Sequence, residues 1–350
     1  MLDLIRTFAH LHICTFEYLH IHISAHQDMI LITGATGFLG SELALRLIEE
    51  GVNVRCTKRA SSSIPEILKP YSKQIEWVEA DLMDVFALES ALAGAAQVYH
   101  CAAWVSLKQA DKNDMIRVNV TGTANLVNLC MDYDCRLVHV SSVAAIGLAK
   151  PGDLITENHH LDQATETDGY ALSKLESEME VWRGIAEGLD AVIVNPSIII
   201  GPSAGTSGSG ELFDRVRKGL KFYTSGSGGF VDVKDVAKCM ITLMNTDIMA
   251  ERFIICAENY TFRQITTEIA EGFGIKPPSI YASPWMMGVA WRAARLWAAL
   301  TGTNPAIDKV SAQSASITHD YDNSKIKKAI GVEFKSISES VKEICKTLKM

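Results

Sequence analysis

A tyrosine and a lysine four residues apart, Tyr170 and Lys174, form the first group in the sequence that could do chemistry. On a helix this spacing places the phenol and the ammonium on the same face. The pKa of an isolated phenol is ~10, and an adjacent cation favours its ionised form. Such a pair can carry a proton to or from a substrate oxygen. The pattern also arises by chance on exposed helical faces, so its meaning depends on what accompanies it.

A pair of serines, Ser141 and Ser142, ends an apolar segment that precedes the tyrosine in the chain. The segment at 136–141 is typical of a buried strand, so the two hydroxyls are expected where that strand ends. A serine at a strand end together with a downstream Tyr-x-x-x-Lys pattern is much more specific than either motif alone.

Three glycines, Gly34, Gly37 and Gly40, follow the first apolar run of the chain, in the segment MILITGATGFLG at 29–40. A helical pattern at 41–50 comes directly after them. A turn without Cβ atoms lets backbone N–H groups reach a pyrophosphate at the positive end of the next helix. The segment therefore predicts a dinucleotide site between a strand and a helix.

Strand-like and helix-like segments alternate from Met29 onward, which predicts parallel βαβ units in an α/β fold. We expect further strands at 52–57, 75–79, 96–101, 136–141 and 191–195, and long helices at 119–133 and 170–188. The Gly/Ser-rich stretches at 203–210 and 224–229 are expected to be loops, either inert linkers or substrate lids. We favour a lid for the first, because it follows the carboxyl end of a sheet strand, where ligands bind in open α/β folds.

Composition and charge limit the class of protein. The chain has 350 residues, 48% of them hydrophobic, which suffices for one large α/β domain and a smaller one. Its net charge of −8 argues against nucleic acid as a partner. Its eight cysteines contain no CxxC pair, so we expect reduced thiols and a cytoplasmic location. The longest apolar stretch, at 281–300, is interrupted by Arg292 and Arg295 and is a poor membrane span.

Residues 1–28 differ from the rest of the chain, because they hold five of its ten histidines and precede Met29, from which the first strand could start. They lack the basic start and the small-residue cleavage site of a secretory signal. We expect no metal site among these histidines, because they lack the supporting shell that metal-binding histidines normally have. We interpret the segment as an N-terminal extension that is not part of the fold.

From Met29 almost to its end, the chain resembles the extended short-chain dehydrogenase/reductase family. The resemblance implies a Rossmann-type doubly wound parallel sheet at 29–197, to which 230–257 returns, and a smaller, mainly substrate-binding region at 198–350. It aligns Ser142 with the catalytic serine, and Ser141 is the second choice because the double serine leaves the register open. The implied catalytic set is Ser142, Tyr170, Lys174 and Asn119.

The same resemblance implies roles for these residues. Ser142 and Tyr170 would donate to the alkoxide that forms during hydride transfer, Lys174 would hold the nicotinamide ribose, and Asn119 would anchor a water of the proton relay. The cofactor would also contact the glycine turn, the adenine pair after the third strand, and the ends of the fourth and sixth strands. These contacts are Gly34, Thr36, Gly37, Phe38, Leu39, Gly40, Asp81, Leu82, Ala102, Ala103, Pro196 and Ser197, with Tyr170 and Lys174.

The end of the second strand predicts which dinucleotide binds. A carboxylate there usually contacts the ribose 2′-hydroxyl of NAD, whereas the 2′-phosphate of NADP requires a cation. The chain offers Lys58 and Arg59, with no acidic residue before Glu66. We therefore expect NADP, with NAD as the alternative if these are only solvated charges.

Within the family, the motifs are most similar to dihydroflavonol reductase and cinnamoyl-CoA reductase, which share the NPSIIIGP form of segment 195–202. This resemblance implies NADP(H)-dependent reduction of a small-molecule carbonyl to an alcohol. The alternative is a nucleotide-sugar epimerase with tightly bound NAD, although the Arg-x-x-Asn pattern of such enzymes is missing. Val143 and Ala144 replace the Asp-Glu pair of sugar dehydratases. A non-catalytic NADP-sensing regulator is a third reading, but such proteins typically lose the tyrosine or the lysine, and both are present.

The apolar stretch at 281–300 carries three tryptophans, Trp285, Trp291 and Trp297. It could cover a bulky apolar substrate or rest at a membrane surface. We weigh packing in the core of the smaller domain at least equally, because an aromatic stripe on a helix is usually core. The family resemblance also implies a homodimer through the two long helices that flank the sheet.

Overall fold

The structure, a computed structural model, describes residues 29–106, 109–150, 152–161, 168–205, 208–301 and 315–349. The predicted extension at 1–28 lies outside these residues, so the structure does not test it.

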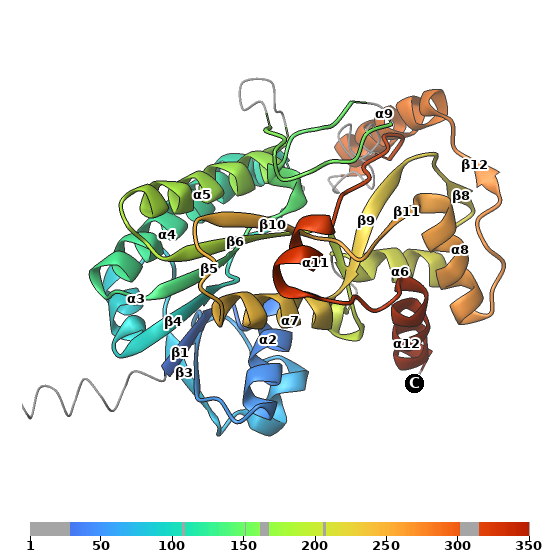
Figure 1. Ribbon diagram of the computed structural model, residues 1–350. Helices are drawn as coiled ribbons and strands as arrows, with labels where there is room; N and C mark the ends of the chain where they lie inside the picture. Colours follow the sequence, from blue (N-terminus) through green and yellow to red (C-terminus); the bar gives the residue numbers. More distant parts are fainter. Residues whose placement is uncertain are drawn as a thin grey trace, which may run out of the picture.

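Seven parallel strands form the main sheet, in the order β10-β6-β5-β4-β1-β2-β3 (Figure 1). Their bounds are β1 (Met29–Thr33), β2 (Val54–Lys58), β3 (Ile75–Glu79), β4 (Ala95–His100), β5 (Arg136–Val140), β6 (Ala191–Pro196) and β10 (Glu251–Ile255). The chain runs outward from β1 through β2 to β3, and then continues on the other side of β1 through β4, β5 and β6. This reversal beside β1 creates the crevice in which open α/β sheets bind their ligands. The predicted doubly wound parallel sheet is confirmed.

Helices cover both faces of this sheet, and β1 shows why. Ile30 and Ile32 belong to one core with residues of α2 (Phe38–Glu49) and α7 (Val233–Met244), whereas Leu31 belongs to a second core. The second core is formed with α3 (Val85–Leu92), α4 (Lys112–Asp132) and α5 (Gly169–Ala186). Successive side chains of a strand point to opposite faces, so a strand that is covered on both faces is apolar throughout.

A smaller mixed sheet follows at the carboxyl end of β6, in the order β11-β9-β7. Its strands are β7 (Ile198–Ile200), β9 (Ser227–Asp232) and β11 (Glu258–Thr261), and β8 (Phe222–Tyr223) pairs separately with β12 (Ile280–Tyr281). The helices of this part are α6 (Gly210–Arg217), α8 (Phe262–Phe273), α9 (Pro284–Thr301), α11 (Ser324–Ile330) and α12 (Ile337–Lys349). Short 3-10 helices are η1 (Glu66–Tyr71), η2 (Gln109–Asp111), η3 (Val143–Ala145) and η4 (Pro202–Ala204).

Two helices begin earlier than the sequence patterns predict. The helix α4 begins at Lys112 instead of Asn119, so its first turns extend beside the segment after β4. The helix α2 begins at Phe38 instead of Ser41, because Gly37 is its N-cap residue. Gly40 therefore lies within the first helical turn.

The prediction of a loop at 224–229 is wrong for its last three residues. Ser227 and the two glycines after it belong to β9, where they pair with β11 and are buried. A Cβ on Gly229 would lie only 2.6 Å from Cys256 Sγ, so glycine is needed for this close packing. The predicted loop at 203–210 contains η4 and the start of α6, and residues 206–207 are outside the described part.

The aromatic stretch at 281–300 does not pack in the core of the smaller domain. In α9, Trp285 is 72% exposed and Trp297 is 69% exposed, and of the α9 side chains that the structure describes only Ala298 is buried. The helix is apolar on most sides, so an apolar face stays exposed to solvent even where another face packs against the protein.

The described cysteines agree with the expected reduced thiols. Seven free cysteines are present, and six of them are buried. Among the described residues, no helix is long and apolar enough to cross a membrane. Nor do the described histidine, cysteine and acidic side chains gather into a group that could hold a metal ion.

Candidate active site

The glycine turn forms a backbone surface between β1 and α2. Gly34 has a φ angle of +74°, and a Cβ there would lie 2.5 Å from the backbone nitrogen of Ala102. A Cβ on Gly40 would lie 2.3 Å from the Gly34 carbonyl oxygen, to which the Gly37 N–H donates at 2.9 Å. Thr36, Phe38 and Leu39 belong to the same turn and the first turn of α2. Gly37, the N-cap residue of α2, has no side chain, and among the described residues no side-chain cap bonds the first N–H groups of this helix. Such N–H groups fit a dinucleotide pyrophosphate.

A buried threonine fixes the end of β4 to the end of β1. Thr33 Oγ1 lies 2.7 Å from His100 Nδ1 and accepts from the Ala102 N–H at 3.4 Å. His100 Nε2 lies 3.0 Å from Thr123 Oγ1 on α4. Burial lowers the pKa of His100 to about 3, so the imidazole is neutral at physiological pH. These bonds hold Ala102, and with it Ala103, against the glycine turn.

The residues expected at the adenine follow β3. Asp81 Oδ1 accepts from the Met83 N–H at 2.9 Å. Leu82 packs on α4, where a Cβ added to Gly122 would lie 2.6 Å from its Cβ, and its carbonyl accepts from Asn125 Nδ2 at 3.0 Å. The local hydrogen bonds therefore order this segment beside the crevice, and its contact with adenine stays a prediction.

The two cations expected at the 2′-phosphate differ in their surroundings. Lys58, at the end of β2, lies 4.0 Å from a carboxylate oxygen of Glu79 on the neighbouring strand. Arg59 is exposed, and no carboxylate of the described residues pairs with it. Arg59 is thus the cation that is available to an incoming phosphate.

Ser142 and Tyr170 meet where β5 ends and α5 begins. Ser142 follows β5 closely, and Tyr170 lies in the first turn of α5. The Ser142 hydroxyl accepts from the Ala144 N–H at 3.1 Å and lies near enough to the Tyr170 phenol to affect its pKa. Burial raises the pKa of Tyr170, and the nearby Ser142 side chain lowers it only in part. The phenol therefore stays protonated and can donate to a substrate oxygen.

Lys174 lies one helical turn after Tyr170, and its Nζ donates to the Val140 carbonyl at 3.0 Å. Burial lowers the pKa of Lys174 to about 8, while Cys101 and Glu178 act in the opposite direction. The expectation that Lys174 depresses the pKa of Tyr170 is not met in this structure, because desolvation of the buried phenol outweighs every other influence there.

The two neighbouring serines serve different partners. Ser141 is buried and its hydroxyl donates to Glu178 Oε2 at 2.6 Å. Only Ser142 approaches Tyr170. Ser142 was the first choice from the family resemblance, and its contact with a substrate stays a prediction.

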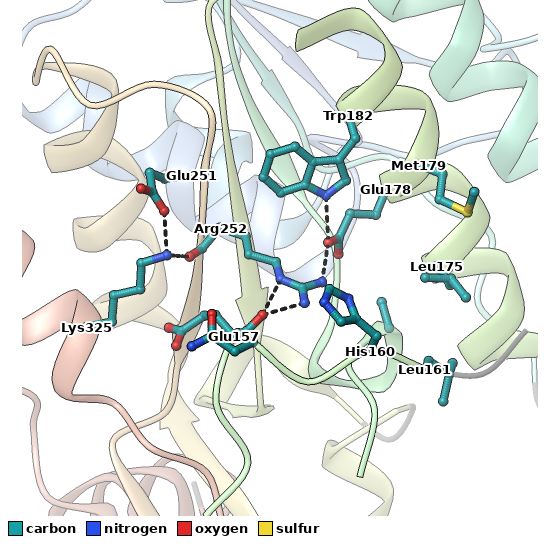
Figure 2. A pocket seen from close by; sticks show the side chains of 12 residues that line it. Glu157, His160, Leu161, Leu175, Glu178, Met179, Trp182, Glu251, Arg252 and Lys325 are labelled. Atoms are coloured by element: carbon teal, nitrogen blue, oxygen red, sulfur yellow. Dashed lines mark hydrogen bonds and ion pairs between the residues drawn. The ribbon is translucent and has the colours of Figure 1, made fainter. Parts of the chain in front are cut away.

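Glu178 is a buried carboxylate that the sequence analysis missed. Its Oε2 accepts from Ser141 and from Asn195 Nδ2, the latter at 2.8 Å. Its Oε1 accepts from Arg252 at 2.9 Å and from Trp182 Nε1 at 3.2 Å, as the dashed lines in Figure 2 show. The carboxylate therefore joins β5, β6 and β10 to α5.

This network also reaches Ser142. Asn195 donates its second N–H to the Ser142 carbonyl at 2.9 Å, so Glu178 holds Ser142 through one intermediate side chain. Helical spacing carried a signal for this residue, because Tyr170, Lys174 and Glu178 follow one another at intervals of four and share one face of α5.

Asn119 holds the segment that follows β4. Its side chain accepts from the Trp104 N–H at 2.7 Å, and it donates to the Trp104 carbonyl at 2.9 Å and to Ser173 Oγ at 3.3 Å. These contacts position the segment between α4 and α5. A water-anchoring role for Asn119 in proton transfer stays a prediction.

Pro196 and Ser197, expected at the nicotinamide, are both buried at the end of β6. Ser197 donates to the Ile255 carbonyl twice, from Oγ at 3.2 Å and from its N–H at 3.0 Å. The bonds tie β6 to β10, and the nicotinamide contact of both residues stays a prediction.

A pocket of about 490 Å³ lies beside α5, lined among others by Glu178, Arg252 and Lys325 (Figure 2). Ser142, Tyr170 and Lys174 are not among its lining residues, so these three side chains lie outside this pocket. Two ion pairs lie in its lining, Arg252 with Glu178 and Lys325 with Glu251.

The sheet reversal, the uncapped glycine turn and the Ser-Tyr-Lys cluster define a dinucleotide-binding α/β protein. Residues 30–256 match the model of the NAD dependent epimerase/dehydratase family. The chain belongs to this family, as the sequence motifs predicted.

Two curated relatives align with most of the chain. A Synechocystis protein named after dihydroflavonol 4-reductase is 31% identical over 328 residues, which cover 91% of this chain and 94% of that protein. Sterol demethylase protein B of Methylococcus capsulatus is 32% identical over 266 residues, 74% of this chain and 79% of the relative.

The fold is shared with solved structures. UDP-glucose 4-epimerase of Thermotoga maritima superposes with a TM-score of 0.74 at 20% identity, covering 92% of this chain and 98% of the epimerase. At this identity the likeness shows the fold alone.

Proposed function

We propose that the protein is an NADP(H)-dependent reductase that converts a small-molecule carbonyl to an alcohol. The observation that carries the proposal is the approach of the Ser142 side chain to the Tyr170 phenol at the carboxyl ends of the strands, with Lys174 one turn further on. The relative named after dihydroflavonol 4-reductase, which aligns over almost the whole chain, supports the same reaction.

When bound, the nicotinamide ring supplies a hydride to the substrate carbon. Ser142 and Tyr170 donate hydrogen bonds to the carbonyl oxygen, and these bonds strengthen as the oxygen gains negative charge. Tyr170 then gives its proton to the oxygen, which leaves an alcohol and a phenolate. The raised pKa of Tyr170 suits this direction, because the phenol begins the cycle protonated. Protonated Lys174 would hold the nicotinamide ribose, and a proton from solvent restores the phenol.

NADP is proposed over NAD because Arg59 is exposed and free of a carboxylate partner among the described residues. Arg59→Ala should raise the Kd for NADPH by about one to two decades and change that for NADH little, because only NADPH loses a charge-assisted hydrogen bond. Arg117→Ala, which removes an exposed arginine of α4, is the matched control. Equal losses for both dinucleotides would remove the argument.

A bound-cofactor assay separates the reductase from the epimerase. A reductase releases its spent cofactor in each cycle, whereas an epimerase oxidises and re-reduces one substrate without exchange. We expect the purified protein to carry little dinucleotide and to oxidise added NADPH stoichiometrically with an aldehyde or ketone that has a sizeable apolar part. The measurement is the dinucleotide content of the denatured supernatant, followed by NADPH consumption across a carbonyl panel.

Two results would contradict the reductase. One equivalent of NAD released per chain, no NADPH consumption and interconversion of a nucleotide sugar would establish the epimerase. Tight NADPH binding without consumption by any carbonyl would indicate a sensing regulator.

A further inference from the structure

The helix α9 presents an apolar row to solvent. Trp285, Val289, Ala293 and Trp297 follow one another at intervals of four, which places them side by side along the helix. All four are exposed, Val289 to 58%. Large apolar side chains in a contiguous exposed row mark an interaction surface more often than chance exposure.

The strand pair formed by β8 and β12 carries further exposed apolar side chains. Ile280 and Tyr281 of β12 directly precede α9, and Ile280 pairs with Phe222 of β8. All three side chains are exposed. Figure 1 shows α9, β8 and β12 at the same end of the molecule, away from the helices α3 and α4. We refer to these exposed residues of α9, β8 and β12 together as the α9 face.

The α9 face is basic although the chain as a whole is acidic. The segment 284–301 contains Arg292 and Arg295 and no aspartate or glutamate, in a chain of net charge −8. Both arginines are exposed, and the Arg292 guanidinium lies 4.6 Å from the centre of the Trp291 ring. Lys221, whose carbonyl accepts from the Ile280 N–H at 3.1 Å, adds an exposed ammonium at the edge of β12.

Tryptophan and arginine together on an otherwise apolar helix match the interface of a bilayer, where indole rings lie at the headgroup level. The positive charges complement anionic headgroups, to which the remainder of this acidic chain is poorly suited. We propose that the α9 face docks the protein peripherally on a membrane surface that carries anionic lipids. The proposal does not depend on the reductase activity, because binding to lipid is measured without substrate or cofactor.

The test is sedimentation of the full chain with vesicles. Vesicles of equal parts phosphatidylcholine and phosphatidylglycerol should retain the protein at low salt, pure phosphatidylcholine vesicles should retain much less, and added salt should release it. Vesicles whose acyl chains are brominated should quench the tryptophan fluorescence of the bound wild-type protein, which locates the indoles at the bilayer without any substitution.

Variants assign the binding to the α9 face. Trp285→Ala/Trp297→Ala and Arg292→Gln/Arg295→Gln should each weaken binding to the mixed vesicles roughly tenfold or more. Phe86→Ala is the matched control, because Phe86 is an aromatic side chain on α3 that is 80% exposed, and its loss should leave binding unchanged. Substitutions at such exposed positions should leave the melting temperature close to that of the wild type.

Any of three outcomes would overturn the proposal. They are no retention by mixed vesicles, retention that Phe86→Ala weakens as much as the tryptophan variant does, and retention without quenching by brominated lipid. A self-association that Trp285→Ala/Trp297→Ala abolishes, in a protein that ignores vesicles, would show instead that a second copy covers the α9 face.

Discussion

At the scale of single residues, the site depends on two neighbouring hydroxyls that have different partners. Ser142 lies near the Tyr170 phenol, whereas Ser141 donates to buried Glu178. Ser142→Ala should therefore lower turnover by roughly 10²-fold, as expected for loss of a donor to the reacting oxygen. Ser141→Ala should leave turnover within a few-fold of the wild type and instead cost about 1 kcal/mol of stability, because it removes a buried hydrogen bond.

The measurements are kcat with a reactive carbonyl and the melting temperature of each variant. The two serine variants are each other's control, since both remove one hydroxyl from adjacent positions. A larger loss of turnover in Ser141→Ala than in Ser142→Ala would reverse the assignment.

We expect the protonation state of Lys174 to set the pH dependence of turnover. Its pKa is lowered by burial to about 8, so the ammonium is present below that pH and is lost above it. Turnover should therefore fall as the pH rises through about 8. Glu178 raises the pKa of Lys174, so Glu178→Gln should move this alkaline limb to lower pH.

The control for that shift is Glu180→Gln, which removes one carboxylate from the same helix but from a side chain that pairs with Arg183. Other charged or titratable groups near Lys174 are Cys101 and the buried imidazoles of His100 and His139. These are unchanged in both variants. An alkaline limb at the same pH in Glu178→Gln and in wild type would exclude the electrostatic link.

At the scale of elements, the site is a meeting of strand ends, and the close approach of β1 to β4 sets its shape. Gly34 has both a positive φ angle and a backbone neighbour, Ala102, at the position of a Cβ. Gly51 has a similar φ of +80° with nothing within 4 Å of the added atom. Gly51→Ala should thus cost only the conformational strain, about 1–2 kcal/mol.

Gly34→Ala should cost more than Gly51→Ala and should also weaken NADPH binding by at least roughly tenfold, because Ala102 and the turn must move apart. Thermal unfolding and NADPH titration of both variants are the measurements. Equal melting temperatures and equal affinities would show that the close approach of β1 and β4 is unimportant.

At the scale of the whole molecule, the first described strand begins at Met29 and its glycine turn follows at once. Deleting residues 1–28 should therefore leave activity and melting temperature essentially unchanged. A drop of several degrees, corresponding to roughly 1 kcal/mol or more, would show that the segment packs on the fold. A homodimer through α4 and α5 also stays a prediction at this scale.

Local patterns in the sequence determined the sheet, its helices and the glycine turn. Apolar runs with a period of two or 3.6 and glycines that follow a strand express constraints between near neighbours, so β1, α2 and the Tyr170–Lys174 spacing could be predicted. The same is true of the family, whose motifs lie in short segments.

Only the tertiary structure decided which side chains meet across the molecule. The different partners of Ser141 and Ser142, the position of the Glu178 carboxylate between three strands and the hydrogen bonds of Asn119 to Trp104 all depend on contacts between distant segments. The exposure of Trp285 and Trp297 could not be predicted from the sequence either. The sequence of an apolar helix does not indicate which of its faces the rest of the chain will cover. Burial and partner choice are properties of the packed molecule, and a one-dimensional pattern constrains them weakly.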